Sequence, residues 1–164
     1  MTTLMEIYEE RVRQGDLHGD PAQVSILALF DDVAGRMQKP VKKRLFKRLG
    51  KSANPFKGLY LFGGVGRGKS MLMDMFFDWM DEPRKRRVHF HAFMQEIHTL
   101  MHDARQLGVE DAIAPVAEEV ITSSKLLCFD EMQITDITDA MIVGRLFEKL
   151  FEAGVVIVAT SNRH

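Results

Sequence analysis

A glycine-rich segment beginning at residue 63 constrains the fold of this 164-residue chain more than any other feature. It reads Gly-Gly-Val-Gly-Arg-Gly-Lys-Ser and fits the pattern G-x-x-x-x-G-K-[ST]. Glycine lets a backbone wrap closely around a phosphate, because no Cβ blocks the approach. The freed N–H groups then form an anion-binding nest. We therefore predict a phosphate-binding loop formed by Gly63, Gly64, Val65, Gly66, Arg67, Gly68, Lys69 and Ser70.

The sequence on either side of this loop has the character that a phosphate site requires. Residues 59–62 are typical of a buried strand, and residues 71–80 are mostly apolar and predict a helix. The start of that helix adds unpaired N–H groups and a positive dipole end. In this setting Lys69 offers a compact positive charge to the terminal phosphates of a nucleotide, and Ser70 offers a hydroxyl ligand for magnesium. The alternative is a glycine-rich turn that matches by chance.

A second cluster of polar residues follows the apolar run at residues 126–129. Such a run fits a strand that is buried on both faces of a parallel sheet, and ligands bind at the carboxyl ends of strands in open α/β sheets. We predict that Asp130 holds magnesium through its water shell and that Glu131 polarises an attacking water. Asn162, at the end of another buried-type strand, is predicted to bond the γ-phosphate or that water.

Helical and strand patterns alternate along the rest of the chain and indicate an α/β fold. Helices are expected over residues 2–13, 21–37, 92–106, 115–121 and 137–153, and further strands over 87–91 and 155–162. Asp20 and Asp136 are expected helix caps, and Gly154 an expected helix stop. The apolar stripe of the last helix is predicted to comprise Ile137, Met141, Phe147, Leu150 and Phe151.

Bulk composition argues for a globular protein without a membrane span. Hydrophobic residues make up 46% and charged residues 27%, and the net charge of -1 does not favour a nucleic-acid partner. The chain start lacks the features of a secretory signal, and no apolar run approaches the length of a membrane span. The single cysteine, Cys128, excludes an internal disulfide and suits a reducing compartment.

One concentrated run of basic residues lies between residues 39 and 51. We interpret it as a solvated connector, with contact to acidic polymer, nucleic acid or lipid as the alternative. The run comprises Lys39, Lys42, Lys43, Arg44, Lys47, Arg48 and Lys51.

The motifs, taken in order, resemble an AAA+ ATPase core. Their finer detail resembles the ZapE cell-division ATPases and their mitochondrial AFG-type relatives. The segments that carry this resemblance are Gly58–Ser70, Val88–His91, Cys128–Glu131, Asp136–Met141 and Ala159–Arg163.

The resemblance implies a P-loop NTPase fold of the AAA+ type, a three-layer αβα sandwich with a parallel sheet in the order 5-1-4-3-2. It implies ATP and magnesium as cofactors, with Lys69 and Ser70 binding them, Asp130 and Glu131 as the second acidic motif and Asn162 as the first sensor. It further implies a cytoplasmic ATPase that forms homo-oligomers and remodels a protein partner, which in bacteria is linked to the division ring. The mitochondrial relatives are linked to turnover of respiratory subunits.

Members of that family continue beyond the position of His164 into an arginine finger, a fifth core strand and a helical lid. We therefore expect an N-terminal portion with a helical segment and connector at 1–55 and an ATPase core at 56–164, incomplete at its C-terminus. Such a chain is expected to hydrolyse ATP slowly by itself and to expose strand 59–62 as a sheet edge. Three alternatives remain: a helicase-loader-like switch that binds single-stranded nucleic acid, a small-molecule kinase, and a nucleotide-binding module without turnover.

Overall fold

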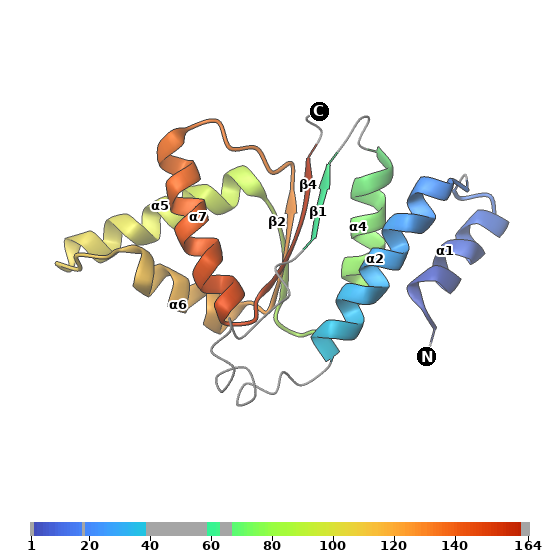
Figure 1. Cartoon of the computed structure of the whole chain (residues 1–164), viewed down its shortest axis with the longest axis horizontal. Coiled ribbons are helices and arrows are strands. Elements are labelled where there is room, and N and C mark those ends of the chain that lie inside the picture. Colours follow the sequence, from blue (N-terminus) through green and yellow to red (C-terminus); the bar gives the residue numbers. More distant parts are fainter. Residues whose placement is uncertain (1, 18, 39–58, 63–66, 162–164) are drawn as a thin grey trace, which may run out of the picture.

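The computed structural model describes residues 2–17, 19–38, 59–62 and 67–161, with the backbone only for 36, 38, 59–62 and 67–70 (Figure 1). The basic run, loop residues 63–66 and Asn162 lie outside the described residues. The elements are α1 (Leu4–Arg13), α2 (Pro21–Gln38), β1 (Leu59–Phe62), α4 (Arg67–Trp79), β2 (Lys85–His89), α5 (Phe90–Gln106), α6 (Ile113–Ser123), β3 (Leu126–Asp130), α7 (Ile137–Glu152) and β4 (Val156–Ser161).

The strands form a parallel sheet in the order β1-β4-β3-β2. This is the predicted order for the strands concerned, and β1 lies at one end of it. Phe62 pairs with Ser161, Phe129 with Ala159, and His89 with Asp130. Because all pairs are parallel, the carboxyl ends of the strands lie along one edge of the sheet.

Helices cover both faces of the sheet and give the predicted three-layer αβα sandwich. Figure 1 shows α5, α6 and α7 on one side, and α4 with α2 and α1 on the other. Strand β3 contributes to the hydrophobic core on each face of the sheet. Leu127 and Phe129 pack in the core with α5, α6 and α7, and Leu126 and Cys128 pack in the core with α1, α2 and α4. All four side chains are buried, as predicted for a central parallel strand.

The predicted helix caps are confirmed. Asp20 accepts a hydrogen bond from the Ala22 N–H at 2.9 Å, and Asp136 accepts one from the Thr138 N–H at 2.6 Å. Gly154 ends the turn after α7 with a φ of +86°, a left-handed conformation that glycine adopts without a Cβ penalty.

Two predictions were wrong: the strand expected over residues 87–91, and part of the set of α7 side chains expected to face the sheet. The second strand ends at His89, and His91 belongs to α5, because His89 caps that helix by accepting a hydrogen bond from the His91 N–H. On α7, Ile137 is 82% exposed and Met141 65% exposed. Successive helical residues are about 100° apart, so Ile137 and Met141 face away while residues next to them in sequence face the sheet. The other three predicted residues are confirmed, because Leu150 is buried and Phe147 and Phe151 pack against the core. The buried residues of α7 are Ile142, Val143, Leu146 and Leu150.

None of the helices in the described part of the chain is both long and apolar enough to cross a bilayer.

Packing of α2 on α4 generates a prediction about stability. Phe30 is buried and its ring stacks on Phe76 with the ring centroids 4.5 Å apart. We expect Phe30→Ala to lower the free energy of unfolding by about 3–5 kcal/mol, because the substitution leaves a cavity. Leu29→Ala is the matched control, since Leu29 lies on the same helix and is 48% exposed. Urea denaturation followed by circular dichroism should separate the two variants, and equal losses would contradict this packing.

Burial of Cys128 generates a second prediction. The side chain lies in the core beneath α4, and burial raises the pKa of its thiol to about 12. A thiol with a raised pKa stays protonated and unreactive at pH 8. We expect no alkylation by iodoacetamide at that pH in the folded protein and rapid alkylation in denaturant. Equal rates in the two conditions would show that the β3 core opens readily.

Candidate functional site

The predicted site residues that the structure describes meet at the carboxyl edge of the sheet. Asp130 is the last residue of β3, and Glu131 follows it directly. Strand β1 ends at this same edge, and α4 begins five residues after it at Arg67. Gly68, Lys69 and Ser70 continue the first turn of α4, where their backbone is helical. The loop sequence therefore joins the end of β1, at the carboxyl edge of the sheet, to the start of α4. Of the remaining predicted residues, Gly63, Gly64, Val65, Gly66 and Asn162 lie outside the described residues.

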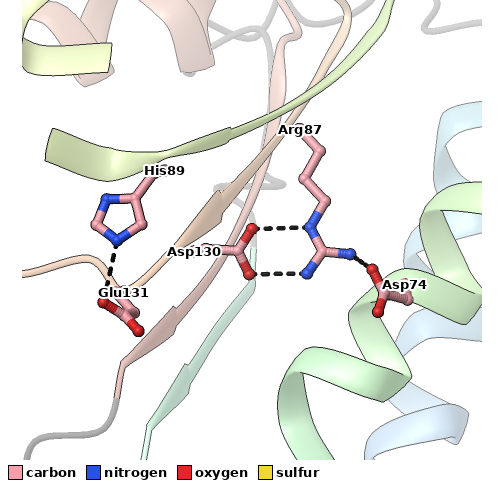
Figure 2. Close-up of polar contacts among 5 residues, drawn as sticks. All are labelled: Asp74, Arg87, His89, Asp130 and Glu131. Atoms are coloured by element: carbon pink, nitrogen blue, oxygen red, sulfur yellow. Dashed lines mark hydrogen bonds and ion pairs between the residues drawn. The ribbon is translucent and has the colours of Figure 1, made fainter. Parts of the chain in front are cut away.

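Asp130 is held by a guanidinium from the neighbouring strand. Arg87 Nε donates to Oδ2 of Asp130 and Arg87 Nη2 donates to Oδ1, both at 2.8 Å (Figure 2). Both side chains are largely covered, with the arginine 19% and the aspartate 24% exposed. This two-pronged geometry is the strong form of an arginine–carboxylate contact. The hydrogen bond to Asp130 raises the pKa of Arg87, so the guanidinium stays charged.

The third nitrogen of the same guanidinium contacts helix α4. Arg87 Nη1 forms an ion pair with Asp74 Oδ1, and Figure 2 shows Arg87 lying between Asp130 and Asp74. Asp74 lies one helical turn after Ser70. One side chain on β2 thus connects strand β3 with the helix that follows the phosphate-loop sequence.

Glu131 is held by a histidine from the end of β2. Nε2 of His89 lies 3.0 Å from Oε2 of Glu131, while Nδ1 of His89 accepts the His91 N–H at 3.4 Å. Because Nδ1 accepts, the proton of the neutral ring is placed on Nε2, which donates to the glutamate. The glutamate side chain remains 63% exposed. Glu131 is thus oriented by a hydrogen bond and accessible to water.

The backbone at Glu131 adopts an unusual conformation. Its φ is +51°, and it is the one positive value at a non-glycine residue among the residues the structure describes. Residues held in this region cost on the order of 1–3 kcal/mol and cluster at functional sites. The next residue is fixed to the adjacent strand, since the Met132 N–H donates to the Thr160 carbonyl at 2.8 Å. The chain therefore turns sharply after Asp130 and directs Glu131 away from the path of the strand.

The donor set at this edge fits a magnesium ion held jointly with a nucleotide. Asp74 and Asp130 share the Arg87 guanidinium, and Glu131 contacts His89, so carboxylates outnumber the guanidinium among these contacts. A carboxylate has about four acceptor positions, so Asp130 keeps about two for metal-bound water. Within the described ranges no three histidine, cysteine or carboxylate side chains form a metal cage. Magnesium is usually held by one or two carboxylates plus substrate phosphates, so a dedicated cage is not required.

Sequence reasoning missed Arg87, His89 and Asp74. The available clue was the strand order: if β2 lies beside β3, polar residues near the end of β2 must lie beside Asp130 and Glu131. Alternation along β2 then places Arg87 and His89 on the same face of the sheet.

Comparisons with known proteins agree with this geometry. The chain is 47% identical over 119 residues to lactation elevated protein 1 homolog B of Danio rerio, which covers 67% of this chain and 24% of that protein. It is 43% identical over 116 residues to the cell division protein ZapE of Escherichia coli strain K12, covering 71% of this chain and 30% of the relative. The chain thus spans less than a third of the length of either relative in these matches.

The fold is similar to that of AMPPCP-bound DnaA from Aquifex aeolicus. The TM-score is 0.56 at 14% sequence identity, and the match covers 99% of this chain and 42% of the DnaA chain. At this level of identity the similarity concerns the fold alone, which is that of a P-loop ATPase domain. The family model of the AFG1-like ATPases matches residues 2–164. The chain therefore belongs to the AFG1-like ATPase family.

Proposed function

We propose that this chain binds ATP with magnesium at the carboxyl edge of its sheet and hydrolyses it. One observation supports the proposal most strongly. Asp130 ends the buried strand β3 and Glu131 follows it, at the same edge of the sheet where β1 ends and the sequence Gly63–Ser70 begins. Phosphate-binding backbone, cation ligands and a candidate base thereby belong to one site. The family supports the ATPase assignment, and DnaA, a protein of similar fold, binds the ATP analogue AMPPCP.

The residues of the loop and of the α4 start have distinct roles in this proposal. Backbone N–H groups of residues 63–68 and the helix terminus bind the phosphates. Lys69 provides charge for the β- and γ-phosphates, and the Ser70 hydroxyl and Asp130 hold magnesium, Asp130 through water. The magnesium ion, when bound, neutralises the charge that develops on the phosphoryl oxygens.

Glu131 is the proposed base that orients and polarises the attacking water. Its exposure lets water approach, and the hydrogen bond from His89 limits the orientations of its carboxylate. Asn162 is proposed to hydrogen-bond the γ-phosphate or the water. A small-molecule kinase would not need a water-activating glutamate beside the magnesium aspartate, so this pair favours hydrolysis.

We further propose that turnover serves to remodel a protein partner, with the division ring linked to the resembled family as the candidate; the name of the relative, cell division protein ZapE, supports a role in division. In this proposal the working form is a cytoplasmic homo-oligomer, and a neighbouring subunit supplies an arginine to the transferring phosphoryl group. Arginine fingers contribute roughly 10³–10⁵ in rate, so we expect slow hydrolysis by the isolated chain. The nucleic-acid alternative depends on the basic run, which lies outside the described residues, and no contact in the described fold favours it.

The proposed phosphate contact of Lys69 can be tested by substitution. We expect Lys69→Ala to weaken ATP binding severely, because it removes the charge directed at the terminal phosphates. Isothermal titration calorimetry would measure the affinity. Arg105→Ala, which removes an exposed cation at the end of α5, is the control and should bind like the wild type. Unchanged affinity of the lysine variant would refute the phosphate-loop assignment.

The proposed base is tested by Glu131→Gln. Glutamine keeps the shape and removes the basic carboxylate, so we expect normal ATP binding with hydrolysis reduced by about 10²–10⁴-fold. Single-turnover assays with excess protein detect slow hydrolysis and suit this chain. Glu119→Gln, an exposed glutamate on α6, is the matched control. If Glu131→Gln hydrolyses ATP at the wild-type rate, another group must activate the water.

A further inference from the structure

We propose that Arg87 is a positioning residue that fixes the separation between the two expected magnesium ligands, Ser70 and Asp130. It does so by contacting Asp130 of strand β3 and Asp74 of helix α4 with the same guanidinium. The inference rests on the proposed ATPase function and extends it to a residue on β2 that lies outside the loop and the acidic pair.

The contact between Arg87 and Asp130 fixes the orientation of the Asp130 carboxylate. Two parallel hydrogen bonds of 2.8 Å hold both oxygens, so the carboxylate cannot rotate without breaking at least one of them. The contact is largely shielded from solvent, which makes it stronger than a surface pair. The oxygens keep free acceptor positions, so the contact orients the ligand without blocking it.

The contact between Arg87 and Asp74 fixes helix α4 relative to the Asp130 carboxylate. Arg87 Nη1 pairs with Asp74, and Asp74 and Ser70 are four residues apart on one helix. Residues at this spacing lie on the same helix face with about 5–6 Å between their Cβ atoms. The backbone position of Ser70 is therefore tied to Asp130 through a single rigid guanidinium.

Arginine suits this role in a way that lysine does not. The guanidinium is planar and offers five donors in a fixed fork, so it can grip one carboxylate with two nitrogens and a second with the third. A lysine ammonium is a point charge on a flexible stem and cannot reproduce the two-pronged contact. Removing the charge altogether would also change the attraction of the site for any cation. Arg87→Lys keeps the charge and removes the fork, so it isolates the geometric role.

The test measures how strongly magnesium promotes ATP binding. A fluorescent ATP analogue would be titrated with Arg87→Lys at increasing magnesium concentration and also in EDTA. Loss of a partner that orients a metal ligand typically costs about 10–100-fold in metal affinity. We expect the half-saturating magnesium concentration to rise by that factor, while the affinity in EDTA stays at the wild-type value.

The neighbouring residue provides a matched control. Arg86 alternates to the other face of β2, where it pairs with Glu96 on α5. Arg86→Lys makes the same chemical change on the same strand and should leave the magnesium response unaltered. Asp74→Ala removes the acceptor on α4 and leaves the contact with Asp130, and the Asp74 side chain is 61% exposed, so the variant should fold normally and shift the response in the same direction as Arg87→Lys.

The outcomes separate this inference from the proposed function. If magnesium strengthens ATP binding in the wild type and Arg87→Lys responds identically, the inference is overturned and the ATP site stands. If the wild type binds ATP without any response to magnesium, both are overturned. If Arg87→Lys fails to fold, the inference is tested with Asp74→Ala, and an unaltered magnesium response in that variant overturns it.

Discussion

The parallel pairing of β2, β3 and β4 determines where the charged groups of this site lie. Parallel strands end at a common edge, so His89 lies beside Asp130, and the end of β1 lies at the same edge on the far side of β4, although these residues are distant in sequence. That pairing depends on β3, whose four apolar residues enter the cores on both faces of the sheet. A strand buried on both sides cannot shift its register without moving every side chain to the wrong core. The positions of Asp130 and Glu131 are therefore a consequence of packing.

A cluster of three carboxylates at one sheet edge repels itself unless cations are present. Arg87 offsets part of this charge within the chain, and the remaining negative charge suits a divalent cation and its water. The positive φ of Glu131 and its contact with His89 separate the two adjacent carboxylates into different environments. Asp130 is largely shielded and accepts two hydrogen bonds from Arg87, whereas Glu131 is exposed and in hydrogen-bond contact with His89. Two neighbouring acids of similar intrinsic chemistry can thus have the different roles that we propose.

Much of the fold could be predicted from the sequence because its elements are marked locally. Caps at Asp20 and Asp136, the stop at Gly154 and the apolar run of β3 depend on adjacent residues. The predicted stripe of α7 was wrong at Ile137 and Met141, which are apolar but face away from the sheet, and helical periodicity alone cannot decide this. The roles of Arg87 and Asp74 depend on contacts between β2, β3 and α4, which are separated by up to 56 positions along the chain. Such contacts require the strand order before they can be inferred.

The most direct test is a crystal structure of the chain with a non-hydrolysable ATP analogue and Mn²⁺, whose anomalous scattering locates the metal. We expect the manganese peak between the analogue's terminal phosphates and Asp130, beside the first turn of α4. We also expect Arg87 to keep both hydrogen bonds to Asp130. A metal or nucleotide bound away from the carboxyl edge of the sheet would show that Asp130 and the loop sequence do not form the ATP site.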